Sequence, residues 1–488
     1  MLTILLLILP LVFSSLIMIA GKNMSKWLAL ASSLVVLFIN VYVFYTFKLD
    51  ATSSLLKWHT EWLPNIGANF FLQFNGINIL LVTLTNLLFP FIFFSVDEQK
   101  TFYADKKFYV LALCMQAALI GVFLAQNLFV FYVFWELTLI PIYFIALLFG
   151  AEGRQKITFK FFIYTLFGSL LMLLAIIYIA TNGKINNLNI NNVYLVASQF
   201  NLQQQIIIFL AFYIAFAIKI PIFPFHTWQP DTYVNAPTQG TMMLSGIMLK
   251  MGTFALLYWL IPIAPFAWKY LSFYLVLIAV ISTIYGACLA LVQKKYKRLL
   301  AYASMSHVGL IAAGIFTYNL QGLQGAMVQM LAHGINVVAI FYTYDIIQKR
   351  TNTDDFKLLK GIRSQNNLFA VLFLIVLLAN VAMPLTNAFV GEFLLLDSIF
   401  QYNYVLSGVA GLSVIFGVTY MLRAYHKMMH GVANETTTNF KPLNFSEKFI
   451  LSTMSLLIIV FGIFPNLILN VSEQELIKLI EHVQSVLK

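Results

Sequence analysis

The sequence predicts an all-α polytopic membrane protein with about fourteen transmembrane helices. Three observations support this fold class. Of the 488 residues, 61% are hydrophobic and only 10% are charged, whereas a soluble domain carries roughly 25% charged residues. Apolar runs of roughly 20 residues, the length that crosses a bilayer, follow one another almost without pause. The loops between these runs are short and hold most of the Lys and Arg residues.

The apolar runs define the expected spans. The first run begins at Leu2 with no basic stretch before it, so we expect a retained span rather than a cleaved signal peptide. After the last run, a polar tail to Lys488 carries apolar residues at partly helical spacing, as in a helix that lies along the membrane surface. The spans are expected near residues 2–20, 27–46, 69–96, 108–125, 128–149, 157–180, 204–225, 238–261, 270–292, 299–317, 323–346, 366–398, 405–422 and 449–466.

Lys and Arg residues are concentrated in the odd-numbered loops, for example at 294–298 and 349–363. Because positive residues mark cytoplasmic loops, both termini are expected on the opposite side. The predicted location is the bacterial inner membrane with periplasmic termini, and the mitochondrial inner membrane is the alternative. The net charge of +11 belongs to these loops, so the lipid bilayer and not nucleic acid is the expected partner.

Two proline-broken spans, 204–225 and 366–398, indicate an inverted repeat, because broken helices in matching positions of two halves mark the ion site of many transporters. Each would be the fourth span of a five-span unit. We therefore expect three N-terminal spans in 1–107, a first repeat in 108–262, a second, inverted repeat in 270–425, and a last helix with an amphipathic tail in 426–488.

Two lysines fall within hydrocarbon-length segments. Lys219 lies in the first broken span, two residues before Pro221, and Lys250 lies about twelve residues into the next span, roughly 18 Å from its start. A lysine at such depth is costly and usually serves the movement of charge. The prolines free backbone groups, which need partners in a protein-lined or wet cavity. The alternative is that the lysine side chains reach the interface along their apolar stems.

Other ionisable residues occur at comparable depth. Glu136 lies about eight residues into its span, either as the partner of a buried lysine or as a carboxyl that hydrogen-bonds for packing. His307 and His333 are relay groups or satisfied core residues. Glu392 lies in the second broken span and is either a proton exit or structural. For Asp397 two interpretations stay open, an interfacial cap or a proton exit.

These residue types suit proton transfer. Lysine titrates near ~10.4 in water, burial lowers its pKa by up to about 3–5 units, and a nearby carboxylate raises it again. A Glu–Lys pair is therefore a switch. Moving one charge against 100 mV takes about 2.3 kcal/mol, which a swing of about two pKa units supplies. The predicted chain of carriers, with water bridging the gaps, is Glu136, Lys219, Lys250, His307, His333 and Glu392.

No resident cofactor is expected on this chain. Cys114 and Cys288 lie in apolar runs far apart in sequence, as packed thiols do. The sequence has no Cys or His cluster for a metal, no haem-attachment motif and no dinucleotide glycine fingerprint.

Several motifs together resemble the antiporter-like subunits of respiratory complex I. They are Phe134-Trp-Glu136, Lys219 with Phe223-Pro-Phe-His-Thr-Trp, Leu249-Lys250, the run from Lys297 to His307, Gln329-Met-Leu-Ala-His333-Gly and Phe389-Val-Gly-Glu392-Phe. The resemblance covers nearly the whole chain. At Glu392, other branches of the family tend to carry a lysine, and the chain has no long lateral-helix extension.

The resemblance implies a proton channel in the membrane arm of NADH–quinone oxidoreductase, driven by quinone reduction elsewhere in the complex. Glu136 and Lys219 would form the switch, Lys250 and the two histidines the central relay, and Glu392 the exit. FMN, iron–sulfur clusters and quinone would sit on other subunits, and the antiporter-like chains L and N would be neighbours. The alternatives are a subunit of a multisubunit Na⁺/H⁺ antiporter or of a membrane-bound hydrogenase complex.

Five positions depart from the family pattern. Lys295 stands where an Asp is usual, Tyr233 and Asn235 where His and an acidic residue are common, and Leu385 where Gly usually follows Pro384. Asp345 occupies a position that is usually small. None is a predicted carrier, so these departures bear on loop details and on cytoplasmic proton entry.

Overall fold

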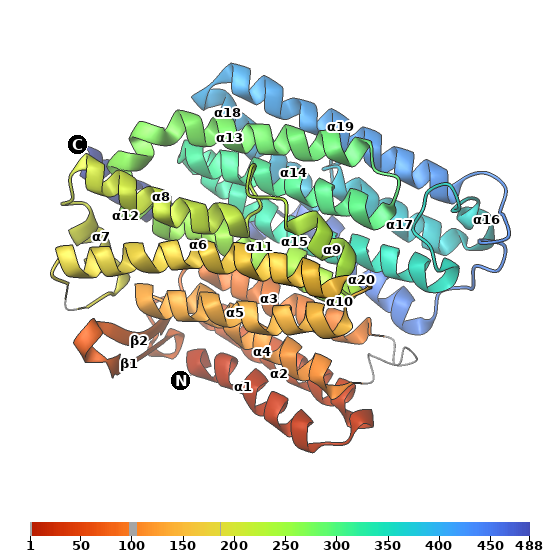
Figure 1. Cartoon of the computed structure of the whole chain (residues 1–488), viewed down its shortest axis with the longest axis horizontal. Coiled ribbons are helices and arrows are strands. Elements are labelled where there is room, and N and C mark those ends of the chain that lie inside the picture. Colours follow the sequence, from red (N-terminus) through yellow and green to blue (C-terminus); the bar gives the residue numbers. More distant parts are fainter. Residues whose placement is uncertain (1, 97–104, 186) are drawn as a thin grey trace.

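The computed structural model describes residues 2–96, 105–185 and 187–488 as a bundle of long helices that run side by side (Figure 1). The elements are α1 (Leu2–Ile19), η1 (Lys22–Met24), α2 (Ser25–Leu49), η2 (Ser54–Leu56), β1 (Lys57–Leu63), η3 (Pro64–Ile66), β2 (Ala68–Gln73), α3 (Asn78–Phe94), α4 (Lys106–Leu124), α5 (Leu128–Phe149), α6 (Arg154–Asn182), α7 (Ile190–Ala197), α8 (Leu202–Lys219), α9 (Gln229–Asn235), α10 (Thr238–Met243), η4 (Leu244–Met248), α11 (Leu249–Ala255), η5 (Leu256–Leu260), α12 (Ile261–Ile263), α13 (Pro265–Leu291), α14 (Tyr296–Thr317), α15 (Leu320–Thr351), α16 (Ile362–Gln365), α17 (Asn367–Asn380), α18 (Asn387–Tyr402), α19 (Tyr404–Met429), α20 (Phe445–Ile463) and α21 (Asn466–Leu487).

The helical membrane architecture predicted from the sequence is confirmed. Within the described residues, 12 helices are long and apolar enough to cross a membrane, and α3 and α17 are shorter apolar helices. Each of the fourteen expected spans coincides with a helical segment. The central helices α14 and α15 are almost wholly buried, whereas α1, α2, α6 and α20 expose many apolar side chains at the rim of the bundle. A rim of this composition suits contact with lipid or with other membrane helices.

One boundary was wrong. The span expected at 69–96 begins instead as β2, which pairs antiparallel with β1, and α3 starts only at Asn78. Gly67, at φ 68°, makes the turn between the strands. A short apolar run such as Phe70 to Leu72 does not distinguish a strand from a helix by periodicity. The fold is therefore helical with one added hairpin.

The two proline-containing spans are broken. α8 ends at Lys219 and helical structure resumes at Gln229, while α17 ends at Asn380 and α18 begins at Asn387. In the second break, Leu385 has a φ of 72°, a left-handed conformation that costs a non-glycine residue about 1–2 kcal/mol. The leucine side chain therefore makes the backbone conformation at position 385 less favourable, and the surrounding packing must stabilise the break.

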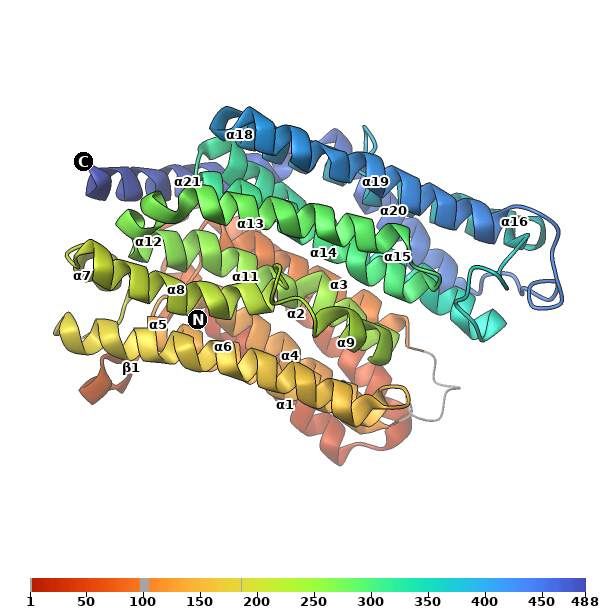
Figure 2. The ribbon, with the colours of Figure 1, turned by 45° about the horizontal axis from the view of Figure 1, so that its top comes forward.

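The two ends of the bundle differ. The chain termini, the β1–β2 hairpin and α7 lie toward one end, and α9 and α16 lie toward the other (Figures 1 and 2). The tail forms α21, whose buried residues Ile468, Leu476, Leu479 and Val483 follow helical spacing while charged residues occupy other positions. Both termini are thus on the same side, as an even number of spans requires.

Glycines bring η4 against α15. A Cβ atom on Gly334 would lie 2.8 Å from Leu84 Cδ2 and 3.0 Å from the carbonyl oxygen of Gly246. A Cβ on Gly246 would lie 2.9 Å from Val338. Small residues at such crossings let membrane helices approach closely. The crossing places the turn that carries Lys250 beside the turn that carries His333.

We predict that Gly334→Val separates these helices, because the facing carbonyl of Gly246 is backbone and cannot rotate away. Overpacking of this kind costs about 1–3 kcal/mol. The variant should lower the melting temperature of the purified assembly and the yield of assembled protein. Gly408→Val is the matched control, since a Cβ there meets no atom within 4 Å. Equal melting temperatures for the two variants would contradict the prediction.

Candidate functional site

The six predicted carriers come from helices that follow one another across the bundle. Glu136 is on α5, Lys219 ends α8, Lys250 is on α11, and Glu392 is on α18. His307 and His333 are on α14 and α15 between them. In the two views α5 lies toward one side of the bundle and α18 toward the other, with α8, α11, α14 and α15 between them (Figures 1 and 2). The carriers therefore form a line that runs across the helix axes, inside the bundle.

Glu136 and Lys219 lie at the first end of the line. Lys219 is only 2% exposed, and its ammonium lies 5.3 Å from the centre of the Trp135 ring. The Glu136 carboxyl attracts this ammonium and also interacts with Ser169 on α6. A buried cation needs such compensation, because removing it from water costs several kcal/mol. The pair is held by electrostatic attraction and by the face of an aromatic ring.

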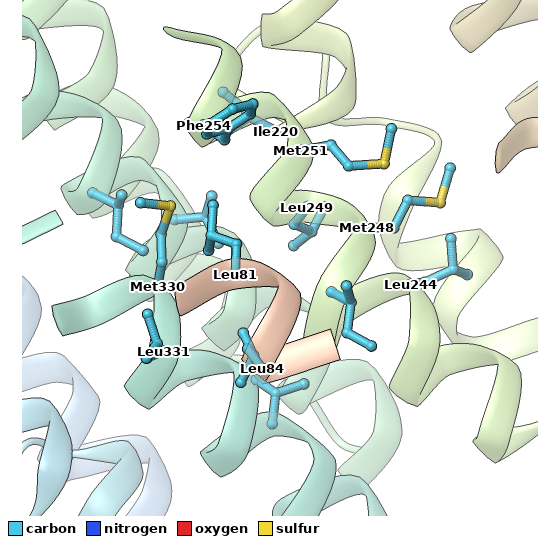
Figure 3. Close-up of a cluster of buried hydrophobic side chains, with 14 of the residues drawn as sticks. Leu81, Leu84, Ile220, Leu244, Met248, Leu249, Met251, Phe254, Met330 and Leu331 are labelled. Carbon is cyan, nitrogen blue, oxygen red and sulfur yellow. The ribbon is translucent and has the colours of Figure 1, made fainter. Parts of the chain in front are cut away.

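Apolar side chains lie next to Lys219 and Lys250. Ile220 follows Lys219 and packs onto Gly252, where an added Cβ would be only 2.4 Å from Ile220 Cγ1. Ile220, Leu249 and Met251 belong to the buried apolar cluster drawn in Figure 3. The backbones of α8 and α11 thus meet closely, and this crossing fixes the relative position of the two lysines.

Lys250 is held by two hydrogen bonds. Its ammonium donates to the carbonyl oxygen of Ser245 at 2.7 Å and to Nδ1 of His333 at 2.8 Å. The side chain is 1% exposed. Ser245 lies in η4, a π-helical turn, and such turns frequently occur at functional sites because they leave the regular helical hydrogen-bond ladder. The irregular turn therefore supplies an acceptor at the depth of the lysine.

His333 continues the chain of contacts through two serines. When Nδ1 accepts from Lys250, the proton of the neutral ring sits on Nε2, which lies 3.2 Å from the hydroxyl of Ser304. The Ser304 hydroxyl in turn lies 2.9 Å from that of Ser245. These contacts close a ring around the buried lysine, so a proton at Lys250 has a hydrogen-bonded route away from it.

His307 and Glu392 form the far end. Nδ1 of His307 donates to Oε1 of Glu392 at 2.9 Å, and Nε2 of Gln329 donates to the same oxygen at 3.1 Å. The His307 and His333 rings are 5.9 Å apart between centroids. A small pocket reaches His307 and Glu392 from the α19 side, where Ser413 lies. The two histidines are thus adjacent but not hydrogen-bonded to each other, at a spacing that one water can bridge.

Asp397 stands apart from this line. It lies five residues after Glu392 on α18, is half-buried, and accepts a hydrogen bond from Gln401 at 2.9 Å. A five-residue step on a helix turns the side chain by more than a quarter-turn, to a different face. The structure therefore places Glu136 near Lys219, groups Lys250 and His333 with His307 and Glu392, and leaves Asp397 on its own.

Sequence reasoning did not single out Ser245, Ser304 and Gln329 as members of the site. For two of them helical spacing could have indicated membership of the site, because Ser304 precedes His307 by three residues and Gln329 precedes His333 by four. Residues so spaced share a helix face. Trp135 was part of a recognised motif, yet its role beneath the lysine became visible only in the structure. In the described part of the chain, no group of three or more His, Cys, Asp or Glu residues could hold a metal ion.

Comparison with known proteins gives a consistent result. The model of the family described as "NADH:quinone oxidoreductase/Mrp antiporter, TM" matches residues 125–417, which include all six carriers. The chain belongs to this family. It is 37% identical over 449 residues to NADH-quinone oxidoreductase subunit M of Rickettsia bellii, covering 92% of this chain and 90% of the relative. It is 32% identical to NADH-ubiquinone oxidoreductase chain 4 of Marchantia polymorpha, covering 98% and 96%.

Solved structures agree with this membership. A chain of respiratory complex I from Thermus thermophilus superposes with a TM-score of 0.85 at 28% identity, covering 98% of this chain and 100% of that one. A chain of the Mrp complex from Dietzia sp. superposes with a TM-score of 0.83 at 19% identity. The second match shows the shared fold alone.

The contacts of Glu392 predict different outcomes for two substitutions. Glu392→Gln keeps an amide oxygen that can accept from His307 and Gln329, so assembly should be close to normal. Glu392→Leu leaves both donors without an acceptor, at a cost of about 1–3 kcal/mol for each buried group. The leucine variant should have the lower melting temperature in a thermal-shift assay of the purified assembly. If glutamine proved as damaging as leucine, the hydrogen bonds would not be the stabilising element.

Proposed function

We propose that this chain is a proton-translocating membrane subunit of NADH:quinone oxidoreductase, the counterpart of subunit M and of mitochondrial chain 4. The chain carries no redox chemistry of its own. FMN, iron–sulfur clusters and quinone are bound by other subunits, and quinone reduction there drives the movement of protons here. Its neighbours in the membrane are other subunits of the complex, chains L and N among them. The cytoplasmic side is the end that carries α9 and α16, because loop Lys and Arg residues are concentrated there.

One observation carries the proposal. A line of ionisable side chains crosses the interior of the bundle, and two of its links, Lys250 to His333 and His307 to Glu392, are direct hydrogen bonds. Buried ionisable groups in membrane proteins are costly and mark ion and proton paths. A helix bundle that served only as a structural element in the bilayer would not need buried ionisable residues. The arrangement therefore supports proton transfer within the protein.

The geometry suggests how the line works. When Glu136 faces Lys219, attraction keeps the proton on the lysine; when the pair separates, the lysine releases it. Lys250 then receives a proton and hands it through His333 and Ser304 toward His307. Glu392 accepts it last, beside the pocket at α19. The electrostatic energy of separating Glu136 from Lys219 changes the proton affinity of the lysine and so drives the transfer.

We predict that Glu136→Gln and Lys219→Ala each reduce NADH-driven proton uptake into proteoliposomes roughly tenfold, a loss that corresponds to about 1.4 kcal/mol in the barrier. Both variants should still assemble, because Lys219 keeps the Trp135 ring when Glu136 is changed, Glu136 keeps Ser169 when Lys219 is changed, and neither substitution removes a backbone contact. Exposed Lys269→Ala is the control for the loss of a lysine. Normal pumping by Lys219→Ala would exclude that residue from the path.

Lys250→Arg should also slow turnover, because arginine keeps a positive charge but does not deprotonate in proteins. The measurement is proton uptake at equal content of assembled complex. An unchanged rate would mean that Lys250 supplies only a fixed charge.

The assignment to this complex has its own test. The chain should purify together with flavin- and iron–sulfur-containing subunits that oxidise NADH. A membrane assembly that exchanges Na⁺ for H⁺ without NADH oxidation would identify a multisubunit antiporter instead. A hydrogenase complex would show hydrogen-dependent activity.

A further inference from the structure

A second group of buried polar atoms lies beside the Lys250–His333 centre, at its α9 side. Tyr233 and Gln229, both on α9, are fully buried. The Tyr233 hydroxyl is close to Gln229, Ser245 and Ser304. Yet among the described residues none hydrogen-bonds to this hydroxyl or to Oε1 of Gln229. Buried polar groups are ordinarily satisfied, and ordered water commonly satisfies those that have no partner within the protein.

Tyr233 is held in a fixed orientation. Its ring packs edge-on against Phe341 of α15, with centroids 6.2 Å apart. Its backbone carbonyl accepts a hydrogen bond from Thr241 at 2.9 Å. The hydroxyl lies near Ser304, which contacts His333, and near Ser245, whose carbonyl oxygen accepts from Lys250. Packing that fixes the ring in this way suits a group with a positional role.

The backbone next to Tyr233 contacts a second buried cation. Lys297 of α14 is 4% exposed and donates to the carbonyl oxygens of Val234 at 3.2 Å and Ala236 at 2.7 Å. The carboxylates of Asp345 and Asp354 attract the same ammonium. Lys297 precedes Ser304 by seven residues, two turns or roughly 10 Å along the same face of α14. Tyr233 thus lies between two charged centres.

Asp345 adds a buried acid to this outer group. It is 3% exposed and pairs with Lys349 at 2.6 Å, one turn further along α15. Phe341, which supports the Tyr233 ring, lies one turn before it. Buried carboxylates are costly in a membrane protein, and those that are present usually have a function. Two helices, α14 and α15, therefore each carry a charged residue of the outer group and a relay residue of the inner one.

We propose that Tyr233, together with a water molecule bound to Gln229, conducts protons between the outer group around Lys297 and Asp345 and the inner centre of Lys250 and His333. This inference rests on the proposed function. In each transfer the water receives a proton from the outer group as its own proton passes to the phenol oxygen, and the phenol proton passes to the Ser304 oxygen. The Ser304 proton moves to Nε2 of His333 as the ring gives its Nδ1 proton to the neutral amine of Lys250. Each O–H or N–H bond that forms is matched by one that breaks, and no charge is left on the phenol, the water or the serine. The line of carriers then has a branch toward the cytoplasmic end of the bundle.

The alternative is that Tyr233 only fills space. A phenylalanine would then serve equally well, because it keeps the ring contact with Phe341 and loses only the hydroxyl. The comparison of tyrosine with phenylalanine at position 233 therefore tests the role of the hydroxyl alone. Histidine offers the opposite change, since an imidazole carries a proton by itself.

The test measures the rate of NADH-driven proton pumping by the complex in proteoliposomes. Tyr233→Phe should lower this rate several-fold at normal assembly, and Tyr233→His should restore a large part of it. The control is Tyr213→Phe, which removes a hydroxyl from a buried tyrosine that packs against Phe209 and Phe316, away from the line. Pumping at the normal rate by Tyr233→Phe would overturn the proposal.

A second variant covers failure of the first to assemble. Gln229→Met keeps the length of the side chain and removes the oxygen that would bind the water, so it should lower pumping as well; a normal rate would overturn the proposal. Lys219→Ala separates the two levels of inference. If Lys219→Ala is impaired while both α9 variants pump normally, only the branch is wrong, whereas normal pumping by Lys219→Ala removes the basis of the proposed function.

Discussion

The structure depends on the accommodation of one buried ammonium group, that of Lys250. Removing such a group from water costs several kcal/mol unless acceptors replace the solvent. Here the acceptors are the carbonyl oxygen of Ser245, which lies in the π-helical turn η4, and the ring nitrogen of His333. Both must come within 3 Å of one atom, which requires α15 to lie almost against η4. The glycine pair at 246 and 334 makes that approach sterically feasible.

The line of carriers combines hydrogen-bonded links with electrostatic ones. Lys250 and His333 are in contact, whereas Ile220 and its apolar neighbours border the crossing between the two lysines. At an effective dielectric constant near 20, two unit charges about 10 Å apart still interact by roughly 1.7 kcal/mol. That energy exceeds the ~1.4 kcal/mol of one pKa unit. At such a distance a change of charge on one buried group can therefore alter the proton affinity of another without a hydrogen bond between them.

Sequence patterns predicted the helical spans and the depth of each ionisable residue, because both follow from a one-dimensional count along an apolar run. The pairing of Lys250 with His333 could not be counted, since 83 residues separate them and only the packing of α15 joins them. The role of Ser245 could not be predicted either, because it depends on a π-helical turn that no residue type specifies. The β1–β2 hairpin was missed because Phe70 to Leu72 fits a strand and a helix equally well.

The break after Lys219 explains why a lysine can reside there at all. As the last residue of α8, it lies at the negative end of the helix dipole, which favours a cation. The backbone groups that the break releases find partners within the protein, since Trp228 donates to the carbonyl of Ile218 and Ser282 accepts from the amide of Phe223. The helix end and the Trp135 ring remain when the Glu136 charge changes. Glu136 therefore adjusts the stability of the Lys219 charge, while the fixed groups keep that charge tolerable in the interior.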